Sequence, residues 1–295
     1  MQPSSIQRRD VVGPRRNALE SPISPDVIMV DVEPQFFLAD LVNFQRKQFS
    51  EHLQFFSDNH ADVAFHTDKN DCIKFRRRAR FHDVNVMMKL SLKQASEWGS
   101  RLKPFRELPM ESKKSVLAEY CIAFLLIDHG FKTSKVTETG IWLLQNGSFI
   151  HPDYFFGFPA ANPDVEHIKK KTQIHRNFVT EILQCVIDPF RQLQVDEVEC
   201  AALKTILLLS PSCSKRAIYA GQEVVLAQLH SKCMEGLMDH SVSKFPHHGA
   251  ERFGQIILLL GGIRCGVKTI YNQTRVSDLF NVMTFDPVVK DILLV

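Results

Sequence analysis

Side chains that could bind a metal or act as nucleophiles are numerous in this 295-residue chain, but their spacing matches no catalytic motif. The pair His247-His248 has no further ligand at a fixed spacing, as a metal site would require. The motifs H-E-x-x-H, G-x-S-x-G and the phosphate-binding P-loop do not occur. We therefore expect a protein that is not an enzyme and has no catalytic residues, no metal and no cofactor.

The 7 cysteines are scattered, form no C-x-x-C pair and lie partly within apolar runs. This spacing predicts reduced thiols in an intracellular protein, because disulfide frameworks and zinc modules use regular spacings. The polar, basic N-terminus lacks the apolar core of a secretory signal. No uncharged apolar stretch approaches the roughly 20 residues that cross a membrane. We expect a soluble protein with no membrane contact.

Composition and charge restrict the class of protein further. Apolar residues make up 44% and charged residues 23%, which excludes wholesale disorder. The net charge of +3 is too small to indicate a nucleic-acid partner. Residues 1–30 combine paired arginines with a Ser-Pro-rich stretch, as in a flexible linker, and residues 31–295 fit one domain.

Apolar residues recur at helical spacing through most of this domain. We expect helices over 31–56 (one or two), 83–102, 109–131, 164–193, 195–209, 214–241 and from 248 onward, with a short amphipathic piece at 288–295. The helix ending near Phe131 is apolar on nearly all faces, which predicts a central position. Asn146-Gly147 between apolar flanks predicts a β-hairpin.

Two further segments have alternative interpretations. The basic run Lys74–Phe81 predicts a solvated helix start or loop, with nuclear import or phosphate contact as alternatives. A dinucleotide-binding loop follows a β-strand, but no strand is predicted before Gly261-Gly262 and Gly266. We expect these glycines to permit close contact between helices.

A set of residues at fixed spacing between positions 98 and 117 resembles the signature of a known protein family. Trp98, Gly99, Phe105, Leu108 and Leu117 stand at the spacing of the signature of nuclear receptor ligand-binding domains, which this segment resembles. Ser100 and Ser112-Lys113 replace the basic and Asp-Gln positions of that signature. The segments ECAALKTILLLSP, RFGQIILLLGGIR and VVKDIL resemble the eighth, tenth and activation helices of the family, in the correct order. The resemblance is to nematode-type receptors related to hepatocyte nuclear factor four.

The resemblance implies an all-α fold, a three-layer antiparallel helical sandwich with one small β-hairpin. The N-terminal MQPSSIQRRDVVGPRR resembles the basic extension that follows the zinc-binding DNA-binding domain of such receptors. The eight zinc-binding cysteines that should precede it are absent from this sequence. The resemblance therefore implies no sequence-specific DNA binding by this chain alone.

The resemblance further implies that the terminal helix completes a groove for a coregulator L-x-x-L-L helix. The dipole of a bound helix requires an anion at its N-terminus and a cation at its C-terminus. Asp291 would be the anion, and Arg101 or Lys103 would replace the cation missing at Ser100. The other groove residues would be Lys113, Lys114, Leu117, Val288, Val289, Ile292 and Leu293. Alternatively, the terminal helix only covers the core and Asp291 is solvated.

By the same matching, a cavity for a fatty acid or a sterol-like ligand is implied at the centre of the domain. Large, flexible and mostly uncharged side chains suit such a ligand, but they equally describe a filled core. Lys132 would anchor a polar head group, or would only be a favoured cation at a helix end. The implied lining consists of Met87, Met88, Ser91, Cys121, Ile122, Leu125, Leu126, Lys132 and Trp142.

The functional expectation is a ligand-regulated or constitutive transcription regulator of the nucleus, with the cytoplasm as a second location. Phe253, Ile256, Ile257, Leu260 and Ile263 would form the helix face that pairs with the same or another nuclear receptor. An alternative is a dimerisation partner without DNA-binding capacity that titrates full-length receptors. A lipid carrier is a third alternative.

Overall fold

A computed structural model describes residues 34–51, 55, 76–153, 165–211, 217–279 and 285–293. The predicted linker at 1–30 lies outside these residues, so the domain boundary stays a prediction. The first part of the basic run, Lys74 and Phe75, also lies outside them.

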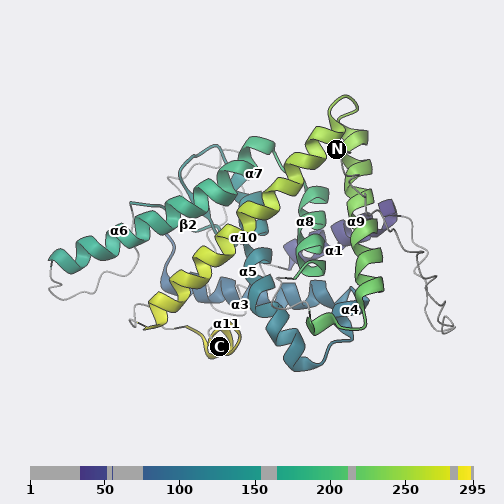
Figure 1. Ribbon diagram of the computed structural model, residues 1–295. Coiled ribbons are helices and arrows are strands. Elements are labelled where there is room, and N and C mark those ends of the chain that lie inside the picture. The colour runs from purple at the N-terminus through teal and green to yellow at the C-terminus, as the bar shows by residue number, and fades with distance from the viewer. Residues whose placement is uncertain are drawn as a thin grey trace, which may run out of the picture. The chain divides into compact units, whose positions relative to one another are not determined.

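The described chain is mostly helical (Figure 1). Its helices are α1 (Pro34–Ser50), α3 (Phe81–Ser100), α4 (Lys103–Arg106), α5 (Met110–Ser134), α6 (Val165–Ile182), a π-helical turn η2 (Leu183–Ile187), α7 (Asp188–Leu193), α8 (Glu197–Leu209), α9 (Glu223–Lys244), α10 (Gly249–Leu279) and α11 (Pro287–Leu293). Strands β1 (Trp142–Leu143) and β2 (Phe149–Ile150) pair antiparallel, with Trp142 opposite Ile150. The all-α prediction with one hairpin is confirmed.

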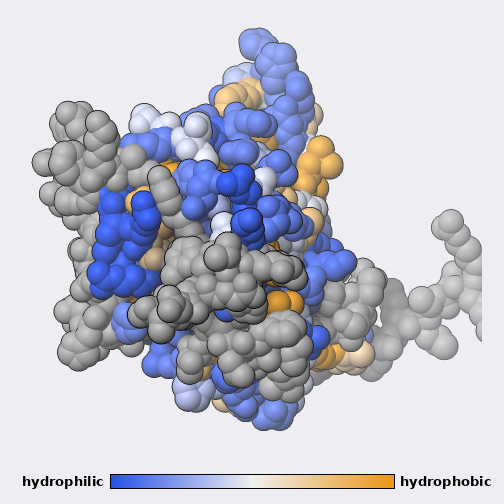
Figure 2. All heavy atoms as spheres, turned by 90° about the vertical axis from the view of Figure 1, so that its left-hand side faces the viewer, coloured by the Kyte–Doolittle hydropathy of each residue, from blue (hydrophilic) through white to orange (hydrophobic). Residues whose placement is uncertain are grey.

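Three layers of helices enclose the core. The middle layer contains α5 and α8, which contact each other. On one side α3 packs against α5 and α1 against α8, while on the other side α10, α7 and η2 pack against α5. Figure 1 shows α10 crossing in front of α5, with α11 below. Figure 2 views the side toward which α6 extends, where the described surface is largely hydrophilic.

Some element boundaries differ from the prediction. The short helix α4 follows Leu102, where Pro104 was expected only to end the preceding helix. Proline fits there because its missing N–H falls in the first turn of α4, where no intrahelical partner is needed. The helix predicted over 214–241 begins at Glu223 within the described residues, and 217–219 form a single 3₁₀ turn.

The prediction that α5 lies at the centre is confirmed, since every residue from Tyr120 to Gly130 is buried. This burial includes an ion pair, in which Lys204 Nζ of α8 lies 2.6 Å from Asp128 Oδ1 of α5. Both side chains are at most 3% exposed. Lys204 Nζ also lies 4.0 Å from the ring centroid of Phe124 and 5.2 Å from that of Trp98. Burial raises the pKa of Asp128, and the Lys204 cation opposes that shift.

The basic run has a structural role where it is described. Arg78 pairs with Phe149 in a parallel bridge, and Ala79 N donates to Phe149 O at 2.8 Å. Arg77 forms an ion pair of 2.6 Å with buried Asp83, which also accepts from Asn146 Nδ2 of the hairpin turn. These bonds fix the hairpin against the start of α3.

The glycines of α10 were predicted to permit close contact between helices. This prediction holds for Gly262 and Gly266, which approach the π-helical turn η2, but not for Gly261. A side chain at Gly262 would collide with the carbonyl oxygen of Cys185. A Cβ at Gly266 would lie 2.9 Å from Leu126 Cδ1. Gly261 instead faces open space.

The helix α10 is long and apolar enough to cross a membrane by length and composition alone. Core helices of soluble proteins pass the same test. Ile256, Ile263 and Ile270 of α10 are buried in the core, which explains part of its apolar character, although only 28% of the apolar segment is buried.

The buried ion pair predicts a large, asymmetric effect of mutation. We expect Lys204→Met to lower the free energy of unfolding by roughly 3–5 kcal/mol, because Asp128 is left buried without its cation. Chemical denaturation measures this loss. The double variant Lys204→Met with Asp128→Leu should recover most of the stability, because an apolar pair replaces both charges. Equal stability of the single variant and the native chain would contradict the prediction.

Candidate functional site

The terminal helix α11 is seated on α3 and α5. Val289 and Leu293 are 1% and 3% exposed, whereas Val288 is 47% exposed. The start of α11 is fixed to α3, because Asp286 N donates to Asn85 Oδ1 at 3.1 Å and Asp286 Oδ2 lies 3.7 Å from Lys89 Nζ. The apolar side of α11 is thus buried, and its polar side faces solvent.

Asp291, the predicted anion, lies on this solvent side and contacts a residue of α5. Its Oδ2 lies 3.4 Å from Lys114 Nζ, which is also 3.7 Å from Glu111 Oε1. The Asp291 carboxylate, followed by that of Glu111, raises the pKa of Lys114. The structure therefore brings together two residues predicted for the coregulator groove that are far apart in the chain.

Two exposed apolar residues lie on the same helix faces as Lys114 and Asp291. Met110 is 66% exposed and stands one turn before Lys114, while Val288 stands one turn before Asp291. Leu117, one turn after Lys113 and Lys114, is 7% exposed. An apolar strip bounded by charge is the surface that an amphipathic helix with apolar anchors requires.

The predicted cations at the end of α3 have other contacts. The Arg101 guanidinium lies 4.3 Å from the centroid of the Phe44 ring, so it is engaged with α1. Lys103 Nζ lies 3.9 Å from Glu107 Oε1, in the helical turn of α4. Ser100 donates its hydroxyl to Ser96 O at 2.8 Å. Lys113, next to Lys114 in the chain, is half-buried and forms no ion pair within the described ranges.

A cavity of about 100 Å³ lies between α3, α5, the hairpin, α6, α10 and α11. Seven predicted residues line it, namely Met87, Met88, Ser91, Cys121, Ile122, Leu125 and Trp142. Sequence reasoning missed Phe81, Val84, Ile150, His175, Phe178, Ile270, Gln273, Thr274, Phe285 and Leu293. Half of these are apolar residues of helical stripes, and such stripes do not reveal whether a side chain meets a neighbour or a void.

Two predicted cavity residues do not line the cavity. Leu126 is fully buried and faces Gly266 of α10, because the helical turn directs it away from Leu125. Lys132 donates to the carbonyl oxygen of Gln145 at 2.6 Å, and so it is held by the hairpin turn. A head-group anchor at Lys132 is therefore not supported by the geometry.

The described cavity lining is mostly apolar, and most of its polar groups are bonded within the protein. Trp142 Nε1 donates to His129 Nδ1 at 2.8 Å, and Thr274 donates to Ile270 O at 2.8 Å. His175 Nε2 lies 2.9 Å from His151 O, and burial lowers the pKa of His175. An uncharged lining suits an uncharged ligand.

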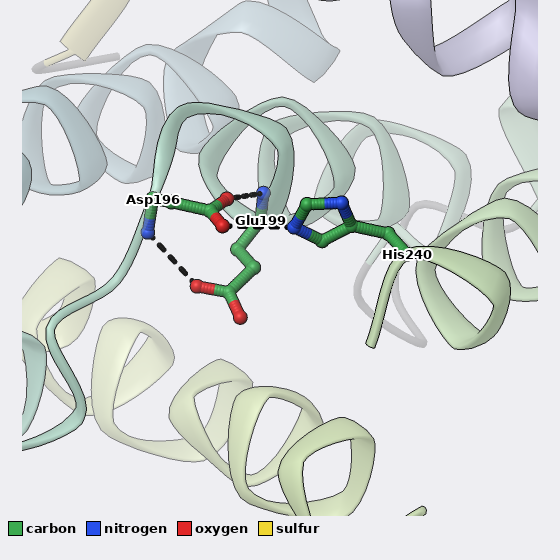
Figure 3. A group of neighbouring side chains, drawn as sticks. All are labelled: Asp196, Glu199 and His240. Carbon is green, nitrogen blue, oxygen red and sulfur yellow. Dashed lines mark hydrogen bonds and ion pairs between the residues drawn. The ribbon is translucent and has the colours of Figure 1, made fainter. Parts of the chain in front are cut away.

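One cluster of possible metal ligands occurs among the described residues, at the start of α8 (Figure 3). Asp196 accepts from Glu199 N at 2.9 Å, and Glu199 accepts from Asp196 N at 2.8 Å, which is a reciprocal helix cap. His240 of α9 approaches from the opposite side, 2.8 Å from Asp196 Oδ2.

Protein cations already occupy this cluster. Lys244 Nζ lies 2.7 Å from Asp196 Oδ2, and both oxygens of Glu199 accept from Arg252 at 2.7 Å. Burial alone would raise the pKa of Asp196, but hydrogen bonds from His240, Lys244 and Glu199 N outweigh it and hold that pKa far below its usual value. The arrangement joins the α9–α10 connection to α8 and has no need of a metal.

The predicted pairing face of α10 requires a correction. Ile256 and Ile263 are fully buried, whereas Phe253, Ile257 and Leu260 pack against the core but stay partly exposed. Leu258, on the opposite side of α10, is 79% exposed, and added side chains at Gly254 and Gly261 would meet open space. The centre of the predicted stripe therefore faces the protein's own core, and the most exposed apolar side chain of α10 lies on a different face.

Comparisons with known proteins agree with this architecture. A family model described as the ligand-binding domain of nuclear hormone receptor matches residues 69–280. Nuclear hormone receptor family member nhr-71 of Caenorhabditis elegans is 28% identical over 208 residues, which are 67% of this chain and 35% of that protein. Hepatocyte nuclear factor 4-gamma of Homo sapiens is 23% identical over 222 residues, which are 75% and 49%. Transcription factor HNF-4 homolog of Drosophila melanogaster is 22% identical over 237 residues, which are 79% and 31%. The chain spans no more than about half the length of these relatives.

The cluster around Asp196 predicts a pH dependence. Because the pKa of Asp196 is lower in the folded than in the unfolded chain, its charge stabilises the fold above about pH 4, and this contribution is lost as the pH falls. Asp196→Asn keeps the helix cap but cannot ionise. We expect this variant to lose roughly 1–3 kcal/mol at pH 7 and to change less than the native chain between pH 6 and pH 3. Urea denaturation at several pH values tests this, and parallel pH curves for the two proteins would contradict it.

Proposed function

The chain belongs to the family of nuclear hormone receptor ligand-binding domains, and from this premise we propose that it regulates transcription in the nucleus by recruiting coregulators through α11. The bound element would be an L-x-x-L-L helix lying between α3, α5 and α11. Recruitment would be regulated by a lipophilic molecule in the cavity, or would be constitutive if the cavity is permanently filled. No step of this function requires catalysis.

One observation carries the proposal: Leu293 belongs both to α11 and to the cavity lining. Phe285, just before α11, also lines the cavity. A ligand that touches both residues adds contacts only when α11 is seated. Ligand binding would therefore favour the seated position and the coregulator surface that depends on it.

Charge complementarity supports the orientation of the bound helix. The positive end of the helix dipole would approach Asp291, and the negative end would approach Lys113 or Lys103. The peptide must compete with Lys114 for Asp291, because these two residues are already paired. Ser100 cannot supply the usual cation at its position.

A labelled L-x-x-L-L peptide tests this proposal directly. We expect Asp291→Ala to weaken peptide binding to the full chain about tenfold, because a charge-assisted contact is lost. Leu293→Ala should weaken it at least as much, because α11 loses its anchor in the core. Fluorescence anisotropy measures both effects.

Two further variants separate this role from a general loss of structure. Asp239→Ala removes an exposed carboxylate on α9 and should leave peptide binding unchanged. Lys114→Ala releases Asp291 from its intramolecular partner and should strengthen binding a few-fold. Unchanged binding in both the Asp291→Ala and the Leu293→Ala variants would show that the groove lies elsewhere.

A second candidate function is dimerisation with another receptor, including the titration of full-length receptors. It is favoured by exposed Leu258 of α10, which stands between Gly254 and Gly261 on the same helix face. Glycines on both sides would let a second helix approach closely, and burial of Leu258 would be favourable.

Leu258→Glu is the variant that tests this face. We expect it to shift the chain from dimer to monomer, because a carboxylate at the centre of the interface would be buried without a partner. Multi-angle light scattering measures the mass. Asp40→Ala, at an exposed position on α1 and away from this face, is the control and should not change the mass. A native chain that is monomeric at all workable concentrations would refute self-pairing.

A further inference from the structure

We propose that the cavity binds a neutral, largely apolar molecule that carries a hydroxyl or carbonyl oxygen, and that it discriminates against carboxylates. This inference rests on the proposed role of the cavity as the ligand site, and it adds the chemical class of the ligand. Three features of the described lining carry it: a buried hydroxyl without a partner, polar neighbours that are already bonded, and the lack of a fixed cation.

The hydroxyl belongs to Ser91 of α3. Ser91 is 1% exposed, and its Oγ has no hydrogen-bonding partner among the described residues. It lines the cavity beside Met87 and Met88. A buried hydroxyl without a partner is unfavourable, so a ligand oxygen that bonds to it gains affinity. Because a hydroxyl both donates and accepts, an alcohol, ketone, ester or amide would satisfy it.

The other polar groups of the lining are less able to select a ligand. The side chains of Trp142 and Thr274 donate to His129 and Ile270, and His175 is bonded to the backbone of His151. Gln273 already has an interaction partner. Ser91 is therefore the polar atom of the described lining that a ligand can engage without breaking an existing bond.

Charge decides between an acid and a neutral ligand. The described lining contains no Lys or Arg, and burial favours the neutral form of His175. The segments 154–164 and 280–284, which adjoin lining residues along the chain, also contain no Lys or Arg. Lys132 is held by Gln145 outside the lining. A carboxylate would therefore lose its hydration without gaining a counter-ion, which is strongly unfavourable.

Two ten-carbon probes that differ only in their head group test the inference on the full chain. Isothermal titration at pH 7.5 compares decan-1-ol with decanoate, which carry the same alkyl chain. We expect decan-1-ol to bind at least tenfold more tightly. Ser91→Ala should weaken decan-1-ol binding about two- to tenfold, the effect of one hydrogen bond, and should leave decanoate unaffected.

Ser96→Ala is the matched control, since Ser96 lies on the same helix but not in the lining. Equal or tighter binding of decanoate would overturn the neutral class, although the cavity would remain the ligand site. Equal decan-1-ol affinity of the Ser91→Ala and Ser96→Ala variants would overturn the role of Ser91. Failure of both probes to bind, while the L-x-x-L-L peptide still binds, would overturn the ligand inference and leave coregulator recruitment standing. If Ser91→Ala does not fold, the comparison of the two probes on the native chain decides.

Discussion

The burial of α5 on nearly all sides is the constraint on which the rest of the molecule depends. Because α5 has no solvent face between Tyr120 and Gly130, helices must cover it from both sides, which produces three layers. Its one buried acid, Asp128, then requires a cation inside the core, and Lys204 of α8 supplies it. The pair fixes the register of α5 against α8, since a shift of either helix would separate the two charges.

Because α5 is fixed in this way, it can serve two sites with different faces. Cys121, Ile122 and Leu125 reach the cavity, while Lys114, two to three turns earlier, pairs with Asp291 at the surface. The helix α11 closes both, with Leu293 toward the cavity and Asp291 toward solvent. A rigid α5 would transmit little by itself, so in the proposed function α11 is the element that would respond to both sites.

Periodicity predicts the helices and the central place of α5, because a helix apolar on every side must be buried. It does not separate Leu125, which lines the cavity, from Leu126, which faces Gly266. Both are apolar and both are buried, and the void between helices depends on side chains from five other elements. The same limit explains α10, where the stripe through Ile256 and Ile263 faces the core and exposed Leu258 was missed. The pairing of Lys114 with Asp291 likewise depends on the tertiary packing of α11 against α5, which local sequence spacing does not predict.

The strength of any regulation is limited by what a ligand touches. A molecule that contacts only Ser91 and the methionines of α3 binds equally well whether α11 is seated or not, so it cannot shift α11 however tightly it binds. Coupling arises only from contacts with Phe285 and Leu293, and by reciprocity a bound coregulator must strengthen ligand binding by the same factor. The burial of Val289 and Leu293 holds α11 in place without such contacts. Under the proposed function, this burial would favour substantial recruitment without ligand, to which a ligand would add a modest increment.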